Sequence, residues 1–287
     1  LMHRRELMSF LHRFFSWFGN LDVGKKGTGP QQAQGPVRIP PDIKEELLAV
    51  GLHLSVATAD IRAPVSTRVT ATDATPQRGG AVECTVSSEL SEALYDACES
   101  RGRRVRLDRG PMAIIPEDES LPEPDPIVSE VARCAPWTTT RNHDFPESQH
   151  INLQELNEVA AEIEYATNLC QTCERLVNIC DSRVAVGAWA RGRSSSVLVN
   201  GILRRSTCWR VFSRKSLGNV FAVSGDNPGD DPSRDCPLRS PEEPSRWLGP
   251  LLRPSVPEVN RARRIPQRLR LCKELFSGCG RLSAALK

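Results

Sequence analysis

Four carboxylate residues stand near the ends of predicted elements, where side chains from distant parts of a chain can meet. Asp73 ends a predicted β-strand, and Asp181 ends another. Glu155 lies in the first turn of a predicted helix, and Asp230 follows the last predicted strand. Carboxylate oxygens are hard ligands for Mg²⁺, and two such ions about 3.5–4 Å apart support phosphodiester hydrolysis. The four residues are therefore candidate ligands for metal-assisted cleavage of a phosphodiester bond.

Each carboxylate taken singly also has an ordinary structural explanation. Asp73 can start a turn, Glu155 can complete a capping box, and Asp181 can cap the helix that follows it. Asp230 can likewise cap a short helix. What favours a shared function is the order of the four residues along an alternating β and α chain.

The elements that position these residues can be predicted from hydrophobic periodicity and turn residues. Strands are expected where β-branched or apolar residues form short runs. Helices are expected where apolar residues recur at the i, i+3, i+4, i+7 spacing. The predicted strands are 68–74, 81–86, 137–145, 176–180 and 219–224, and the main predicted helices begin near Ser88 and His150 and cover 182–191 and 196–212.

Short motifs surround the four carboxylates. They read ATDATPQRGGAV at 71–82, HINLQEL at 150–156, DSRVAVGAWARGRSSS at 181–196 and NPGDDPSR at 227–234. In this order they resemble the ribonuclease H domain of retrotransposon Pol polyproteins, of the retroelement reverse-transcriptase type, over roughly residues 67–235. The resemblance implies an α/β, ribonuclease H-like fold: a mixed five-stranded sheet flanked by helices, with a long insertion and disordered flanks.

The resemblance also implies an activity. Asp73, Glu155, Asp181 and Asp230 would hold two Mg²⁺ ions, with Mn²⁺ as a possible substitute, and the RNA strand of an RNA–DNA hybrid would be cleaved. Asp231 competes with Asp230 for the fourth place, and the motif register favours Asp230. The implied partners are the hybrid and an upstream polymerase domain of the polyprotein, with no membrane and no small-molecule cofactor.

Nucleic-acid contacts are expected mainly at phosphates and 2′-hydroxyls. Basic and hydroxyl residues follow the helix that starts after Asp181, and a further basic group lies on the next helix. A solvated loop and a solvated helix face explain the same residues equally well. The candidates are Arg191, Arg193, Ser194, Ser195, Arg204 and Arg205.

Composition limits the classes of protein that fit this chain. Its 287 residues carry 38 Lys and Arg against 35 Asp and Glu, which excludes a polybasic tail protein and an acidic solvating domain. Twenty-two prolines and 5% aromatic residues favour one modest core. The predicted parts are a polymerase-connection remnant and linker at 1–66, the ribonuclease H-like domain at 67–235 with an acidic Pro-rich insertion at 111–149, a Pro/Arg-rich linker at 236–268, and a truncated methyltransferase-like stub at 269–287.

Cysteine usage and the N-terminal segment bear on location. Ten cysteines scattered along a chain without a signal peptide indicate reduced thiols and an intracellular protein, cytoplasmic or nuclear and not secreted. Cys170 and Cys173 have zinc-like spacing, but free thiols are favoured because no second pair is nearby. The apolar run 7–18 is shorter than the roughly 20 residues of a membrane span. We expect it to form an amphipathic helix that packs on something outside this chain.

Two other classes of function stay open. One is a catalytically inactive retroelement remnant that at most binds nucleic acid; the complete carboxylate set argues against it. The other is a fragment of a DNA methyltransferase dependent on S-adenosylmethionine, suggested by ELFSGCGRLS at 274–283. Only seven residues follow Gly280, which argues against that class. No polymerase active site is expected, because Pro228 and Pro232 flank the Gly-Asp-Asp at 229–231.

Overall fold

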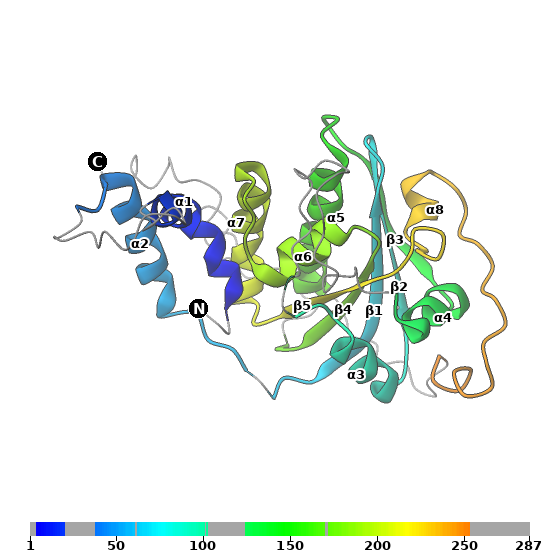
Figure 1. The fold of residues 1–287 in the computed structure, drawn as a ribbon. Coiled ribbons are helices and arrows are strands. Elements are labelled where there is room, and N and C mark those ends of the chain that lie inside the picture. The colour runs from blue at the N-terminus through cyan, green and yellow to red at the C-terminus, as the bar shows by residue number, and fades with distance from the viewer. Residues whose placement is uncertain are drawn as a thin grey trace, which may run out of the picture.

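The central feature of the fold is a five-stranded mixed β-sheet with helices on both faces (Figure 1). The computed structural model describes residues 4–20, 38–60, 62–100, 102, 124–169 and 172–252. In sheet order the strands are β3 (Thr138–Asp144), β2 (Arg78–Thr85), β1 (Val65–Ala74), β4 (Arg175–Cys180) and β5 (Ser216–Phe221).

Strand direction brings two predicted ligands to the same edge of the sheet. β1, β2 and β3 are joined antiparallel, whereas β4 runs parallel to both β1 and β5. Thr72 pairs with Cys180, so Asp73 and Asp181 both follow at the carboxyl ends of neighbouring parallel strands. The predicted fold class, α/β with a mixed five-stranded sheet in a ribonuclease H-like arrangement, is confirmed.

One face of the sheet is covered by α5 (Ile151–Leu169), α6 (Arg183–Arg191) and α7 (Val197–Phe212). Their apolar sides form one core cluster with β4, in which Ile163 and Leu203 are fully buried. Local sequence sets the boundaries of two of these helices. The Ser182 and Ser196 side chains cap the N-termini of α6 and α7. Gly192, with φ +72°, ends α6 in the left-handed conformation that favours glycine.

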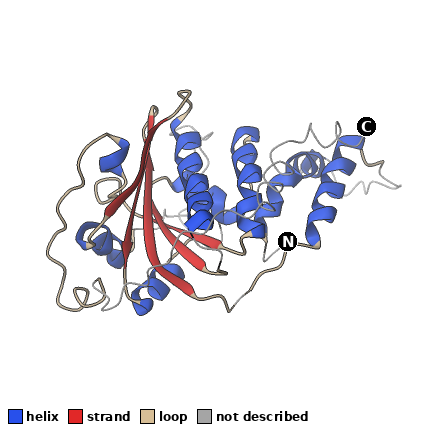
Figure 2. Ribbon diagram, turned by 180° about the vertical axis from the view of Figure 1, so that it is seen from behind, coloured by secondary structure: helices blue, strands red, loops and turns tan. Residues whose placement is uncertain are grey.

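The opposite face carries α3 (Ser88–Asp96), α4 (Pro126–Cys134) and part of the segment 236–252 (Figure 2). Within the predicted Pro-rich insertion at 111–149, residues 126–134 form the helix α4, which was not predicted, and β3 lies where a third strand was predicted at 137–145. Pro126 occupies the first turn of α4, where proline is tolerated, and Val128 and Val131 are fully buried against the sheet. Residues 103–123 lie outside the described residues.

The predicted linker 236–268 also differs from the structure over its first part. Leu248 and Leu252 belong to the core cluster on the α3 and α4 face, and the Ser87 backbone N–H donates to the Leu251 carbonyl. Residues 236–252 therefore extend along the domain. The methyltransferase-like stub and the rest of that linker lie outside the described residues.

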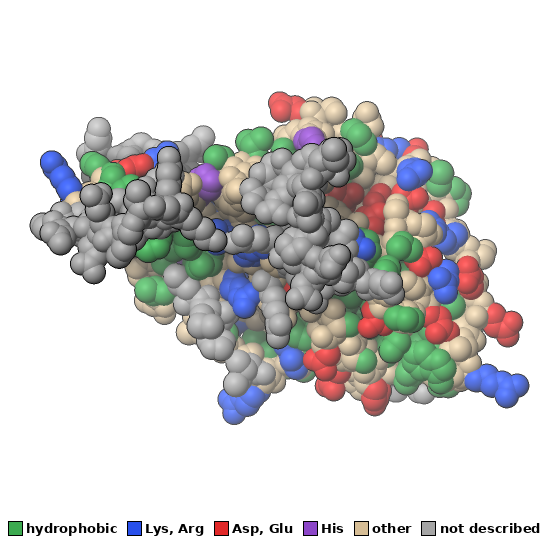
Figure 3. Space-filling view, in the orientation of Figure 1, with side chains coloured by type: hydrophobic (Ala, Val, Ile, Leu, Met, Phe, Trp, Pro, Cys, Tyr) green, Lys and Arg blue, Asp and Glu red, His purple; other side chains and the backbone are tan. Residues whose placement is uncertain are grey.

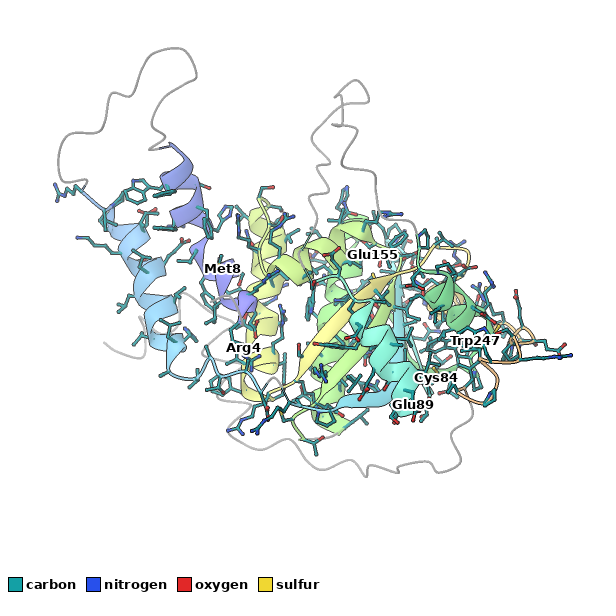
Figure 4. All side chains as sticks on the ribbon, turned by 60° about the horizontal axis from the view of Figure 1, so that its bottom comes forward. Arg4, Met8, Cys84, Glu89, Glu155 and Trp247 are labelled. Atoms are coloured by element: carbon teal, nitrogen blue, oxygen red, sulfur yellow. The ribbon has the colours of Figure 1, made fainter. Side chains whose placement is uncertain are left out.

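The N-terminal segment forms η1 (Arg5–Leu11) and α1 (His12–Asn20), which lie with α2 (Pro41–Leu54) beyond α7 (Figure 1). The prediction that this segment packs on something outside the chain is wrong. Leu7 and Phe10 are buried in the same cluster as α6 and α7, and Figure 4 shows Arg4 and Met8 beside α7. Arg4 pairs with Glu6 at 2.8 Å, and both side chains are buried. The segment is therefore part of the folded unit.

Candidate active site

The four predicted carboxylates come from four different elements. Asp73 lies in β1, Glu155 near the start of α5, Asp181 directly after β4, and Asp230 at the start of α8 (Asp230–Ser233). Figure 4 shows Glu155 near the end of the sheet at which β4 and β5 finish. We call these four residues the carboxylate site.

Asp73 lies within electrostatic range of Asp181 and Asp230, and Glu155 lies within electrostatic range of Asp73 and Asp181. Asp73 and Glu155 are buried, with 4% and 6% of their surface exposed. Burial, followed by the charges of Asp181 and Asp230, raises the pKa of Asp73 to about 7, against a lowering effect of a hydrogen bond from Ser233. Burial, followed by the charges of Asp73 and Asp181, raises the pKa of Glu155 to about 9. Burial and mutual repulsion thus favour the protonated forms of Asp73 and Glu155.

Two oxygens of the site have no hydrogen-bond partner among the described residues. They are Glu155 Oε2 and Asp181 Oδ1, and both atoms are buried. An unsatisfied buried carboxylate oxygen is costly, and a bound cation removes that cost. Glu155, Cys180 and Asp181 each offer one ligand atom, and these three atoms all lie within 4.8 Å of one another. The residues present therefore fit a divalent cation.

Cys180 was not predicted as a member of this group. It is the last residue of β4, directly before Asp181, and it is fully buried. Its position beside a candidate ligand at a strand end is the signal in the sequence that could have indicated it. A single cysteine at a strand end more often fills a core, which is why periodicity alone does not select it.

The turn around α8 supports Asp73 from the other side. The Ser233 hydroxyl donates a hydrogen bond to Asp73 Oδ2 and lies 2.9 Å from the Asp230 carbonyl oxygen. Asn227 Nδ2 donates to the Thr72 carbonyl at 3.0 Å, which ties the turn to β1. The supporting roles of Asn227 and Ser233 were missed by sequence reasoning, although both lie in the motif at 227–234.

Asp230 and Asp231 have different surroundings. Arg239 holds Asp231 through two contacts of 2.9 Å, from Nε to Oδ2 and from Nη2 to Oδ1. Asp230 accepts a 2.7 Å hydrogen bond from Arg234, and its charge raises the pKa of Asp73. Of the two, Asp230 is the residue that acts on Asp73, in line with the register of the motif.

A close approach between β2 and α8 gives a testable prediction. A Cβ added at Gly80 would lie 2.4 Å from the Ser233 nitrogen and 2.7 Å from the Gly229 carbonyl oxygen. These atoms are backbone and cannot rotate away, so Gly80→Ala should displace α8. We expect a loss of stability of about 1–3 kcal/mol, measured by urea unfolding.

The matched control for this variant is Gly51→Ala. Gly51 lies inside α2, and an added Cβ would meet nothing within 4 Å. The same one-methyl change should therefore raise stability by up to about 1 kcal/mol, because alanine is the better helix former. Equal effects of the two variants would contradict the packing seen at Gly80.

Three of the predicted nucleic-acid residues lie together. Arg191, Arg193 and Ser194 line one small pocket with Arg183 at the side of α6. Arg191 donates to the Gly102 carbonyl. The Arg193 guanidinium lies 4.1 Å from the centroid of an aromatic ring in α1, that of Phe15. The pocket is thus basic, and its arginines are oriented by contacts within the fold.

The other three candidates do not line this pocket. Arg204 lies over the Phe10 ring, 5.5 Å from its centroid, and donates to the Ser9 carbonyl at 3.4 Å. Ser195 and Arg205 are exposed. On the face shown in Figure 3, Lys and Arg side chains are interspersed with Asp and Glu side chains. Charge alone therefore does not mark a nucleic-acid groove on that face.

The cysteines that the structure describes form no disulfide with one another. Cys173 donates to the Arg214 carbonyl at 3.1 Å, while Cys170 lies outside the described residues. The free thiols of the described residues are Cys84, Cys98, Cys134, Cys173, Cys180, Cys208 and Cys236.

Comparisons with known proteins identify no family for this chain. No protein-family model, curated protein or solved structure matches it. Within the described ranges, no helix is long and apolar enough to cross a membrane. What the carboxylate site does is therefore inferred from its own geometry and from the sequence motifs.

Proposed function

We propose that this chain is a metal-dependent endonuclease that cleaves the RNA strand of RNA–DNA hybrids, as the ribonuclease H-type part of a retroelement reverse transcriptase polyprotein. One observation carries the proposal. Glu155 of α5 and Asp181 after β4 lie close together at one end of a mixed five-stranded sheet, within electrostatic range of Asp73 of β1, which also feels the charge of Asp230 of α8. Glu155 Oε2 and Asp181 Oδ1 are buried and have no hydrogen-bond partner among the described residues. This is the arrangement that binding of hard divalent cations requires.

The carboxylate site would hold two Mg²⁺ ions, or Mn²⁺ in their place, through Asp73, Glu155, Asp181 and Asp230. Bound ions of this kind supply an activated water and stabilise charge on the leaving oxygen. The protein contributes a rigid frame. Ser233 orients Asp73, and the Ala74 backbone N–H donates to Glu155. Asp73 lies near the end of β1 and Asp181 directly follows its parallel neighbour β4, which fixes their spacing without a long loop.

The basic pocket beside α6 supports contact with a polyphosphate backbone. α6 begins two residues after Asp181, and the pocket is lined by residues along this helix from Arg183 to Arg191 and by Arg193 and Ser194 beyond it. Arg183, Arg191 and Arg193 supply planar donors suited to phosphate oxygens, and Ser194 supplies a hydroxyl. Such contacts recognise backbone shape and not base sequence. We therefore expect cleavage with little sequence preference.

The test is a cleavage assay on the full chain. A labelled RNA–DNA hybrid is incubated with Mg²⁺ or Mn²⁺, beside RNA–RNA and DNA–DNA duplexes and a sample with chelator. We expect cleavage of the RNA strand of the hybrid only, and none with chelator. If the folded protein binds the hybrid but cleaves it with neither metal, the chain is an inactive remnant and the proposal fails.

A further inference from the structure

The carboxylate site contains a sulfur ligand as well as oxygen ligands. We infer that Cys180, Glu155 and Asp181 together bind one thiophilic divalent cation, of the class of Zn²⁺ or Cd²⁺. This inference goes beyond the proposed function, and it stands whether or not nucleic acid is cleaved. It concerns which metals the site accepts.

The first support is the spacing of the three ligand atoms, which all lie within 4.8 Å of one another. A tetrahedral zinc ion with Zn–S of about 2.3 Å and Zn–O of about 2.0–2.2 Å separates its ligand atoms by about 3.5 Å. Each pair would therefore close by at most little more than 1 Å. Cys180 is fully buried and Glu155 nearly so, whereas Asp181 is partly exposed.

The second support is independent of spacing. Glu155 Oε2 lies in a side chain that is 6% exposed, and it has no hydrogen-bond partner among the described residues. Cys180 belongs to the same core cluster as Leu156 of α5, so its thiol lies on the side of the sheet from which Glu155 approaches. A buried acceptor without a donor and a buried thiol thus border the same space. A cation bound there satisfies both groups.

Cys180 also gives a reason for selectivity between metals. A hard ion such as Mg²⁺ gains little from a sulfur ligand. A thiophilic ion binds the thiolate strongly and displaces the proton. The Ser182 backbone N–H, 3.4 Å from Cys180 Sγ, favours the thiolate in that state.

The experiment titrates the full chain with Cd²⁺ and records the ultraviolet charge-transfer absorption of a thiolate–cadmium bond. The variants are Cys180→Ala, Cys180→Ser and Glu155→Gln. Cys208→Ala is the matched control, because Cys208 is also buried in the same cluster but lies on α7. Circular dichroism confirms that each variant is folded, and the two substitutions at Cys180 guard against misfolding of one of them.

We expect the wild-type protein to show absorption for one Cd²⁺ per chain that both Cys180 variants lack and the control retains. Glu155→Gln should raise the Cd²⁺ concentration at half-maximal absorption by at least about tenfold. Loss of even a supporting group costs about 10–100-fold in metal affinity. Equal absorption in the wild type and a folded Cys180 variant would overturn the inference, as would an unchanged midpoint in Glu155→Gln. Because no nucleic acid is present, this result is separate from the cleavage assay.

Discussion

Replacing Asp73 with Asn should reduce cleavage of the RNA strand by at least about 100-fold in Mg²⁺, because a direct ligand contributes more than the supporting groups that cost about 10–100-fold when lost. The charges of Asp181 and Asp230 act on Asp73 and raise its pKa, and the Ser233 hydroxyl donates to its Oδ2. Asn keeps the shape but removes the charge. Initial rates on the labelled hybrid at saturating Mg²⁺ measure the loss.

The control for Asp73→Asn is the same exchange at Asp231. Asp231 is adjacent to a proposed ligand, yet its carboxylate is held by Arg239. The Asp231→Asn variant should therefore cleave the hybrid at a rate within a few-fold of the wild-type rate. The Asp230→Asn variant should lose activity, as Asp73→Asn does. If Asp231→Asn were inactive and Asp230→Asn active, the fourth ligand would be assigned to the wrong residue. An active Asp73→Asn variant would end the proposal of a carboxylate-held metal.

The second large effect concerns stability and pH. Glu155 has a pKa of about 9 in the folded chain against an ordinary 4.5, and Asp73 about 7 against 3.8. The folded state therefore binds protons more tightly than the unfolded state, so this contribution to stability is complete below the ordinary pKa values. It is lost as pH rises toward about 9 for Glu155 and about 7 for Asp73. We expect the metal-free protein, in chelator, to melt at a lower temperature at pH 8 than at pH 6.

Glu155→Gln tests whether Glu155 causes this loss of stability with rising pH. Gln is neutral without taking up a proton on folding, so at pH 8 in chelator the variant should melt about 5 °C or more above the wild type, since about 1 kcal/mol moves Tm by about 2–4 °C in a chain of this size. The measurement is calorimetry or circular dichroism across pH 5–9. A variant less stable than the wild type at pH 8 would contradict the burial of an ionisable Glu155.

Metal should reverse the effect of pH in the wild type. Mn²⁺ at about 100 times its Kd contributes about 2.7 kcal/mol, and its binding displaces protons from Glu155 and Asp73. The shift in Tm caused by Mn²⁺ should therefore be larger at pH 8 than at pH 6, and Glu155→Gln should lose most of it. A shift that does not depend on pH would indicate that the metal binds away from these two carboxylates.

Local sequence was sufficient for much of the fold. The helices predicted at 182–191 and 196–212, and the end of the first of them at Gly192, lie within one residue of the observed α6 and α7, because helix ends depend on neighbours in the chain. The cap of α6 is Ser182, whereas the sequence pattern had allowed Asp181 in that role. The last strand was predicted at 219–224 and lies at Ser216–Phe221. Its start is set by pairing of Ser216 with Arg175 on β4, and such a partner is not visible in the local pattern.

Long-range packing explains the larger errors. The composition of 111–149 favours loop, yet residues 126–134 form α4 because Val128 and Val131 find an apolar sheet face to cover. The N-terminal run reads as a helix in need of a partner, and the partner is α7 of the same chain. Periodicity shows that a segment has an apolar side but does not say what that side meets.

By itself, the sequence determined which residues could serve as hard ligands and in what order they occur. It also indicated that these residues lie near the ends of strands or in the first turn of a helix. Only the tertiary structure decided how they are surrounded. It brought Ser233 into hydrogen-bonding contact with Asp73, which lies 160 residues earlier in the chain. It also paired Asp231 with Arg239 and placed Cys180 beside Glu155 and Asp181. The physical reason is that ligand identity is a property of a residue type, whereas burial, charge repulsion and hydrogen-bond partners depend on which distant segments the sheet brings together.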